Sequence, residues 1–205
     1  MIRDNIILTD ADGVLLNWAY GFNEFLKSQK KWKWIQQDFE LDYGEYHIHK
    51  RYGIEEVTAK KLVLQYNASA HMLFCKPLRD SVKYVRKLYE EHGYKFHVIT
   101  SQTDDKYAAE LRKQNLCNIF GEGVFDGFTI LGCGDDKDDA LVPYAQSGCY
   151  WIEDKPSNAN LALKFGLEGI LVDQLYNRGD VINDAVTRCS DWKAIYKHIT
   201  GEWNV

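Results

Sequence analysis

The sequence lacks a long hydrophobic run, closely spaced cysteine pairs and an excess of positive charge. No stretch approaches the ~18 consecutive apolar residues of a membrane-spanning helix. The 5 cysteines include no CxxC pair, so a structural zinc site has little support and we expect buried or free thiols. The net charge of -5 argues against a nucleic-acid binder that depends on overall positive charge. We therefore expect neither a membrane nor a nucleic acid as partner.

The N-terminus also lacks the pattern of a secretory signal. Its apolar stretch covers only residues 6–8, and the acidic residues Asp4 and Asp10 flank it. We therefore expect a cytoplasmic protein. What is present is the composition of a globular chain, with 45% hydrophobic and 27% charged residues. A length of 205 residues predicts one domain, or one domain that carries an insertion.

Short apolar runs that end in polar clusters recur along the chain and predict buried strands. They lie within residues 3–9, 94–100, 125–131, 149–152 and 169–172. Helical patterns lie between them, at residues 78–91, 104–116, 138–147 and 157–165. Strands that alternate with helices predict a doubly wound, Rossmann-like α/β fold whose parallel sheet is covered on both faces. Ligands bind such sheets at the carboxyl ends of the strands, where these polar clusters fall.

Residues 18–78 interrupt this alternation. They offer no strand, but Phe22, Phe25 and Leu26 have helical spacing. We predict that residues 18–78 are an inserted, mainly helical subdomain, called the insert below, and that residues 1–17 and 79–205 form the core domain. The insert holds 12 of the 28 aromatic residues and has more basic than acidic side chains.

Two aspartates directly after the first predicted strand give the strongest chemical signal. Asp10 and Asp12 are two residues apart, and such a pair is electrostatically unfavourable without a cation. Mg²⁺ prefers oxygen ligands of this kind. Asp154 ends another strand at the same sheet edge and completes the predicted metal site, while Glu153 beside it supports the metal's water ligands. The alternative is that these acidic residues have no metal to bind and belong to ordinary turns.

Other polar residues at the same edge suit a bound phosphate. Thr100 and Ser101 offer hydroxyl and backbone N–H groups, although they can also simply cap the next helix. Lys137 can neutralise a phosphate from the other side. Lys106 and Lys113, in the predicted helix after Thr100, are alternatives to Lys137.

These motifs, in this order, resemble those of the haloacid dehalogenase superfamily. They are Asp10-Ala11-Asp12-Gly13-Val14-Leu15, Val98-Ile99-Thr100-Ser101, Lys137 and Trp151-Ile152-Glu153-Asp154. The resemblance covers most of residues 5–173 and is nearest to the 5'(3')-deoxyribonucleotidase-like phosphatases, which carry an inserted cap. Glu153 departs from the aspartate that many members have at this position.

The resemblance implies a role for each matching residue. Asp10 would be the nucleophile that forms an aspartyl-phosphate, and Asp12 the general acid that later activates water. Lys137 would stabilise the charge on nucleophile and phosphate, and Thr100 and Ser101 would bind phosphoryl oxygens. An acid at position 12 is typical of the phosphatases rather than the dehalogenases of the family.

The resemblance also implies a magnesium cofactor. Mg²⁺ would be bound by the carboxylates of Asp10 and Asp154 and by the backbone carbonyl of Asp12, with Glu153 acting through water. The metal would screen the repulsion between an anionic nucleophile and an anionic substrate.

The insert corresponds to the cap of the family, which closes over the site and reads the leaving group. Trp18, Phe22, Trp32 and Trp34 are candidates for stacking on a nucleobase, or they form the core of the insert. The predicted activity is Mg²⁺-dependent hydrolysis of a small-molecule phosphate ester, with a nucleoside 5'-monophosphate or deoxynucleotide as the leading substrate. Alternatives are phosphoglycolate or a sugar phosphate, a polynucleotide 3'-phosphatase, and a catalytically silent binding protein. The sequence leaves the oligomeric state open.

Overall fold

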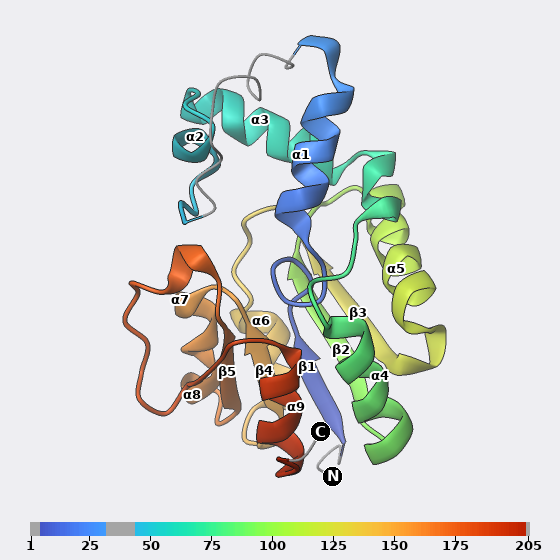
Figure 1. Ribbon diagram of the computed structural model, residues 1–205, viewed down its shortest axis with the longest axis vertical. Coiled ribbons are helices and arrows are strands. Elements are labelled where there is room, and N and C mark those ends of the chain that lie inside the picture. The colour runs from blue at the N-terminus through green and yellow to red at the C-terminus, as the bar shows by residue number, and fades with distance from the viewer. Residues whose placement is uncertain (1–4, 32–43, 204–205) are drawn as a thin grey trace.

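The computed structural model describes residues 5–31 and 44–203, and these form a parallel sheet between two layers of helices (Figure 1). The described residues make six strands in the order β3-β2-β1-β4-β5-β6, and every neighbouring pair is parallel. The strands are β1 (Ile6–Thr9), β2 (Lys95–Ser101), β3 (Phe125–Leu131), β4 (Tyr150–Glu153), β5 (Glu168–Val172) and β6 (Thr187–Cys189). The doubly wound α/β fold predicted from the sequence is confirmed.

The helices of the core domain follow the predicted pattern with shifted ends. They are α4 (Ser81–His92), α5 (Lys106–Phe120), α6 (Asp138–Leu141), α7 (Pro156–Ala159), α8 (Leu161–Lys164) and α9 (Trp192–Thr200). The helix predicted over residues 138–147 ends early and continues as a 3-10 turn over Val142–Tyr144. Strand β6 and helix α9 were not predicted from the sequence. In the described part of the chain, no helix combines the length and apolar character needed to cross a bilayer.

The two faces of the sheet bury separate apolar clusters, because side chains alternate along a strand. Ile7 of β1 packs in a cluster with residues of α4, α5 and α9. Ile6 and Leu8 of the same strand point the other way and pack with residues of α6 and α8. All four residues of β1 are buried, as expected for the central strand of a sheet that is covered on both faces.

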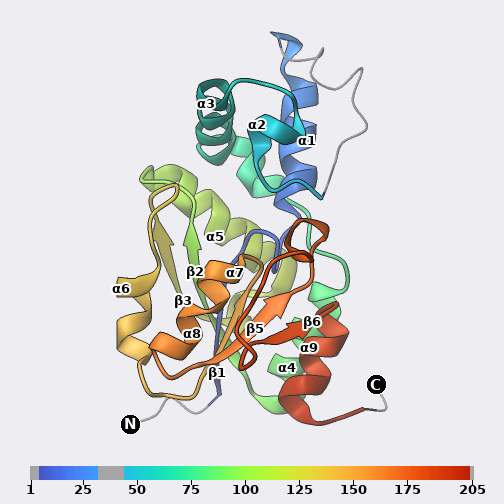
Figure 2. The same cartoon turned by 90° about the vertical axis from the view of Figure 1, so that its left-hand side faces the viewer.

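The described residues of the insert form three helices that lie beyond the carboxyl ends of the strands (Figures 1 and 2). They are α1 (Trp18–Ser28), α2 (Ile48–Arg51) and α3 (Glu56–Asn67), followed by a 3-10 turn over Ala70–Phe74. Aromatic residues of these helices, among them Phe22, Phe25 and Tyr66, form a cluster of their own, which Leu111 of α5 joins. Within the described part of the insert, the aromatic residues therefore serve largely to build its core.

The strand order places the end of β1 where ligands bind in sheets of this kind. Strands β2 and β3 lie on one side of β1, and strands β4, β5 and β6 lie on the other. The strand order therefore reverses direction at β1, and such a reversal leaves a crevice at the carboxyl edge of the sheet. The loop that follows β1 is tight: Gly13 has a φ of 75°. A Cβ at this position would overlap the carboxylate of Asp154 and lie 2.8 Å from the hydroxyl of Tyr176. Glycine is required here by both its backbone conformation and its close neighbours.

The C-terminal helix is tied to this loop by one buried tryptophan, which gives a test of the fold. Trp192 of α9 donates from Nε1 to the carbonyl of Val14 at 2.8 Å, and both residues are buried. We expect Trp192→Phe to lower the free energy of unfolding by about 1–3 kcal/mol, because it leaves a buried carbonyl without its donor. Urea unfolding measures the change. The matched control is Trp203→Phe, because Trp203 is 72% exposed and should shift stability by less than ~0.5 kcal/mol. Equal losses in both variants would contradict this assignment.

Candidate active site

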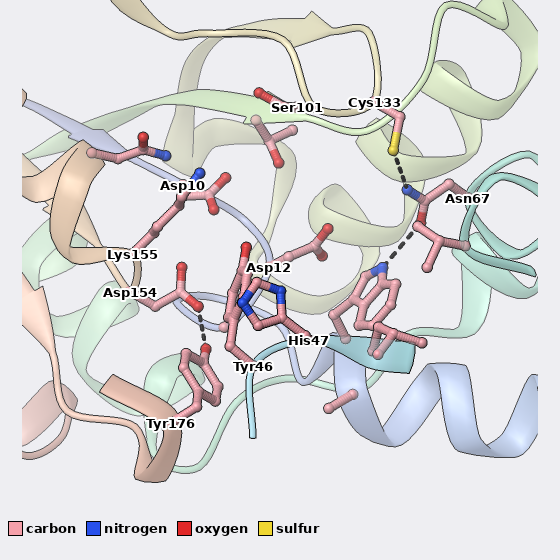
Figure 3. A pocket seen from close by; sticks show the side chains of 18 of the residues that line it. Asp10, Asp12, Tyr46, His47, Asn67, Ser101, Cys133, Asp154, Lys155 and Tyr176 are labelled. Carbon is pink, nitrogen blue, oxygen red and sulfur yellow. Dashed lines mark hydrogen bonds between the residues drawn. The ribbon is translucent and has the colours of Figure 1, made fainter. Parts of the chain in front are cut away.

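A cavity of about 620 Å³ lies between the carboxyl edge of the sheet and the insert. Figure 3 shows Asp10, Asp12 and Asp154 of the core around this cavity, together with Tyr46 and His47 of the insert. Eight of the predicted site residues line it: Asp10, Asp12, Trp18, Thr100, Ser101, Lys137, Glu153 and Asp154. Residues up to 144 positions apart in the sequence are thus brought to one place by the parallel strands.

The ammonium group of Lys137 is buried between two carboxylates. Its Nζ lies 2.9 Å from Oδ1 of Asp10 and 2.6 Å from Oε1 of Glu153. Burial alone would lower the pKa of Lys137, but the charges of Asp10 and Glu153 outweigh burial and raise this pKa above its ordinary value. Of the three lysines that the sequence left open, Lys137 is the one that reaches Asp10. Lys106 is exposed, and Lys113 pairs with a glutamate of its own helix.

Glu153 is hydrogen-bonded to four donors of the protein. Its Oε1 accepts from Lys137 Nζ at 2.6 Å and from Asn158 Nδ2 at 3.0 Å. Its Oε2 accepts from the backbone N–H groups of Asp154 and Lys155 at 3.0 and 3.1 Å. Four donors fill the hydrogen-bonding capacity of a carboxylate. Glu153 therefore holds Lys137 and the loop after β4, and its action on the metal through water stays a prediction.

The carboxylates at this sheet edge fit a hard divalent cation. Oxygen atoms of Asp10, Glu153 and Asp154 lie within 4.8 Å of one another, and all three residues are buried. Burial, and then the charges of Glu153 and Asp10, raise the pKa of Asp154 well above its ordinary value. A cation would relieve this repulsion, and carboxylate oxygens are the ligands that Mg²⁺ prefers. Asp10 and Asp154 are the residues with capacity to hold it.

Tyr176 is a neighbour of Asp154 that sequence reasoning did not find. Its hydroxyl donates a hydrogen bond to Oδ2 of Asp154, which Figure 3 shows. The amide of Asn177 donates to the backbone carbonyl of Asp154 at 2.7 Å. Both residues belong to a 3-10 turn, Leu175–Asn177, in the loop after β5, and this segment carries no motif that the sequence analysis used. Their part in the site follows only from the packing of this loop against β4.

Asp12 is held by a buried arginine that the sequence analysis also missed. Arg112 of α5 donates from Nη1 to Oδ1 of Asp12 at 2.6 Å and from Nη2 to Oδ2 at 3.1 Å. The guanidinium is fully buried, whereas the side chain of Asp12 is 22% exposed, toward the cavity. Burial raises the pKa of Asp12 and Arg112 lowers it; burial dominates, so the pKa lies above its ordinary value. A signal existed, because Arg112 stands on the buried face of its helix between Ala108 and Leu116.

Thr100 and Ser101 lie at the end of β2 and line the cavity. Thr100 is almost completely buried, and the hydroxyl of Ser101 donates to the backbone carbonyl of Asp135 at 2.7 Å. Neither residue caps the following helix. Asp105 does, because its side chain accepts a hydrogen bond from the N–H of Ala108. The helix-cap alternative for Thr100 and Ser101 is therefore wrong, and phosphate binding by them stays a prediction.

The four aromatic residues suggested for base stacking differ in where they lie relative to the cavity. Trp18 lines the cavity, and its ring stacks on Phe22 with centroids 4.9 Å apart. Phe22 is completely buried inside the insert, so its predicted contact with a substrate is wrong. Trp32 and Trp34 lie outside the described residues. A second stretch of the insert, at Tyr46–His49, lines the cavity as well.

Comparison with known sequences gives one curated relative. An uncharacterized 32.4 kDa protein of the Gp30-rIII intergenic region of Enterobacteria phage T4 is 31% identical over 136 residues. This match covers 64% of the chain and 45% of the phage protein, so the chain spans less than half the length of this relative. No protein-family model matches the chain.

Comparison with solved structures identifies the fold. A haloacid dehalogenase-like hydrolase from Streptococcus pneumoniae superposes with a TM-score of 0.69 and 14% identity, over 98% of this chain and 100% of that chain. D,D-heptose 1,7-bisphosphate phosphatase from Burkholderia thailandensis gives a TM-score of 0.58 and 9% identity over 97% and 100% of the two chains. L-2-haloacid dehalogenase from Xanthobacter autotrophicus also gives 0.58, with 10% identity over 99% and 100%. The chain has the haloacid dehalogenase-like fold.

The carboxylate cluster predicts how magnesium and Asp154 affect stability. Without metal at pH 7, we expect Asp154→Asn to raise the melting temperature, because the buried Asp154 carboxylate has a raised pKa and its charge opposes folding. This gain should shrink as the pH falls and wild-type Asp154 takes up its proton. Mg²⁺ at about 100 times its Kd should stabilise the wild type by about 2.7 kcal/mol and Asp154→Asn far less.

Thermal unfolding with EDTA and with Mg²⁺ measures both effects. The matched control is Asp184→Asn, since Asp184 is exposed and lies outside the cavity. This control should keep the wild-type response to Mg²⁺. An equal response to Mg²⁺ in wild type and Asp154→Asn would show that the ion binds elsewhere.

Proposed function

We propose that the chain is a Mg²⁺-dependent phosphomonoester hydrolase that acts through an aspartyl-phosphate on Asp10. The observation that carries this proposal is the surroundings of the Asp10 carboxylate. It lies at the end of the central strand, with the Lys137 ammonium at 2.9 Å and Asp154 in the same carboxylate cluster. The Lys137 ammonium and a bound Mg²⁺ would both reduce the repulsion between the anionic Asp10 carboxylate and an anionic phosphate. Neighbours of the same fold include a phosphatase, which supports the proposal.

Each residue at the sheet edge then has a chemical task. Asp10 attacks the phosphorus, the bond from phosphorus to the alcohol oxygen breaks, and Asp12 gives its proton to that oxygen. Asp12 next takes a proton from a water molecule that attacks the aspartyl-phosphate, which releases phosphate and restores Asp10. Lys137 and Thr100 stabilise the charge on the phosphoryl group. Bound Mg²⁺ supplies electrostatic stabilisation of the phosphoryl oxygens and of the nucleophile.

The insert is proposed to act as a cap over this chemistry. Its residues Trp18, Tyr46 and His47 line the same cavity as the catalytic aspartates. A cover of this kind excludes water, which strengthens the electrostatic interactions inside the site. Because the insert supplies the far wall of the cavity, it is also the part of the chain that contacts the leaving group.

Nucleoside 5'-monophosphates, or their deoxy forms, are the proposed substrates. The support is Trp18, whose ring is already stacked on Phe22 on one side and borders the cavity. A flat, rigid indole of this kind offers a stacking surface for a base. The indole N–H is used by Asn67 at 2.9 Å, which fixes the plane of the ring.

The chemistry is tested by phosphate release with and without Mg²⁺ from nucleoside monophosphates, sugar phosphates and phosphoglycolate. We expect metal-dependent turnover that Asp10→Asn abolishes, because an amide cannot form the aspartyl-phosphate. The matched control, Asp184→Asn, should keep wild-type kcat. Turnover that persists in Asp10→Asn would refute the mechanism, and a chain that hydrolyses none of these esters would favour a binding role.

The nucleotide assignment is tested separately at Trp18. We expect Trp18→Leu to raise KM for its nucleotide substrate by about 5- to 150-fold, since stacking on one base contributes about 1–3 kcal/mol. KM for a small phosphate without a ring should change little, and this serves as the internal control. An unchanged nucleotide KM would remove the stacking role while leaving the hydrolase chemistry intact.

A further inference from the structure

We propose that Arg112 is a positioning residue for Asp12, and that hydrogen bonds through Gln102 and Asn67 couple this position to the insert. The proposal rests on the proposed function, in which Asp12 is the acid and base. Arg112 reaches the Asp12 carboxylate from α5 and does not line the cavity, and its hydrogen bonds go to Asp12, Gln102 and Met72.

The contact between the two side chains fixes the orientation of the carboxylate. Arg112 donates to both oxygens of Asp12, at 2.6 and 3.1 Å, so the carboxylate can neither rotate nor swing away without breaking a bond. Paired donation of this kind gives arginine a geometric specificity that a lysine ammonium cannot copy. A general acid must be held within hydrogen-bond reach of the leaving oxygen, so its orientation affects the rate directly.

The guanidinium is itself held from two further directions. Its Nε donates to Oε1 of Gln102 at 3.2 Å, and its Nη2 lies 3.1 Å from the sulfur of Met72 in the insert. Arg112 and Gln102 are completely buried, as is Met72. The position of the Arg112 side chain is therefore set by Gln102, which follows β2, and by Met72 of the insert, in addition to its own helix.

Gln102 extends these hydrogen bonds to Asn67 and Trp18 of the insert. The backbone carbonyl of Gln102 accepts from Asn67 Nδ2 at 3.1 Å, and its Nε2 donates back to the Asn67 carbonyl at 2.8 Å. The side-chain oxygen of Asn67 accepts from Nε1 of Trp18 at 2.9 Å. Trp18 begins α1 and Asn67 ends α3, so the chain of bonds joins two helices of the insert to Asp12. A substrate that moves Trp18 would therefore act on the orientation of the proposed acid.

The alternative is that the Asp12–Arg112 pair only stabilises the fold. Buried ion pairs are weak evidence for stability, because desolvation offsets much of the attraction. A positioning role and a purely structural role differ in how the rate depends on the leaving group. Loss of a positioned acid slows the release of alkoxide-like leaving groups, which need a proton, far more than the release of a nitrophenolate, which does not.

The experiment compares kcat/KM for an alkyl phosphate and for p-nitrophenyl phosphate in wild type and Arg112→Lys. We expect the alkyl phosphate value to fall about 100-fold, the lower end of a general-acid contribution, and the p-nitrophenyl phosphate value by less than about fivefold. The Lys variant keeps the positive charge but loses the paired donation. The matched control is Lys113→Gln, next in the same helix but partly exposed, and it should leave both values unchanged.

Two further variants keep the proposal testable if Arg112→Lys does not fold. Gln102→Met removes the acceptor of Arg112 Nε and leaves Asp12 and Arg112 in place, and we expect a selective loss of about tenfold on the alkyl phosphate. In an Asp12→Asn background, Gln102→Met should add no further loss, because a residue that acts through Asp12 has no effect once the acid is gone.

The outcomes separate this inference from the function on which it rests. Equal losses on both substrates, or additive losses in the Asp12→Asn background, would overturn the positioning role while the hydrolase assignment stands. Failure of the wild type to hydrolyse either ester, or full activity in Asp10→Asn, would instead overturn the proposed function.

Discussion

The compensation of buried charge around Lys137 is the constraint on which the rest of the site depends. A carboxylate at the end of a buried strand is costly, and two more acids at the same edge increase the cost. One ammonium group bridges Asp10 and Glu153 and makes this arrangement tolerable. The other oxygen of Glu153 accepts from the backbone N–H groups of Asp154 and Lys155, so the carboxylate that Lys137 neutralises also places Asp154.

The bridge divides the acids into two groups with different environments. Asp10 and Glu153 share a cation supplied by the protein, whereas Asp154 has a tyrosine hydroxyl as partner and keeps a raised pKa. The unbalanced charge thus stands next to Asp10, where a divalent cation would satisfy both carboxylates. Asp12 is not part of this cluster and pairs instead with Arg112. Asp10 and Asp12 therefore each have their own cationic partner, Lys137 for the first and Arg112 for the second.

The insert contributes to the site in two ways that its sequence does not distinguish. Part of its aromatic content, such as Phe22 and Tyr66, builds a core that Leu111 of α5 completes. Trp18, by contrast, borders the cavity and takes part in the hydrogen bonds that lead to Asp12. A helical segment of this size must bury apolar surface to be stable, and most of the aromatic residues in its described part are used for packing.

The sequence by itself determined the alternating fold and most of the residues at the sheet edge. Apolar runs followed by polar clusters predict buried parallel strands whose carboxyl ends meet, and this is a local property of the chain. The tertiary structure alone decided which lysine reaches Asp10, how Glu153 is used, and that Arg112 and Tyr176 belong to the site. These depend on how a helix or a motif-free loop packs against distant strands. A long-range contact of that kind leaves no periodic pattern in the sequence. The one local sign is Arg112, a charged residue on a buried helical face.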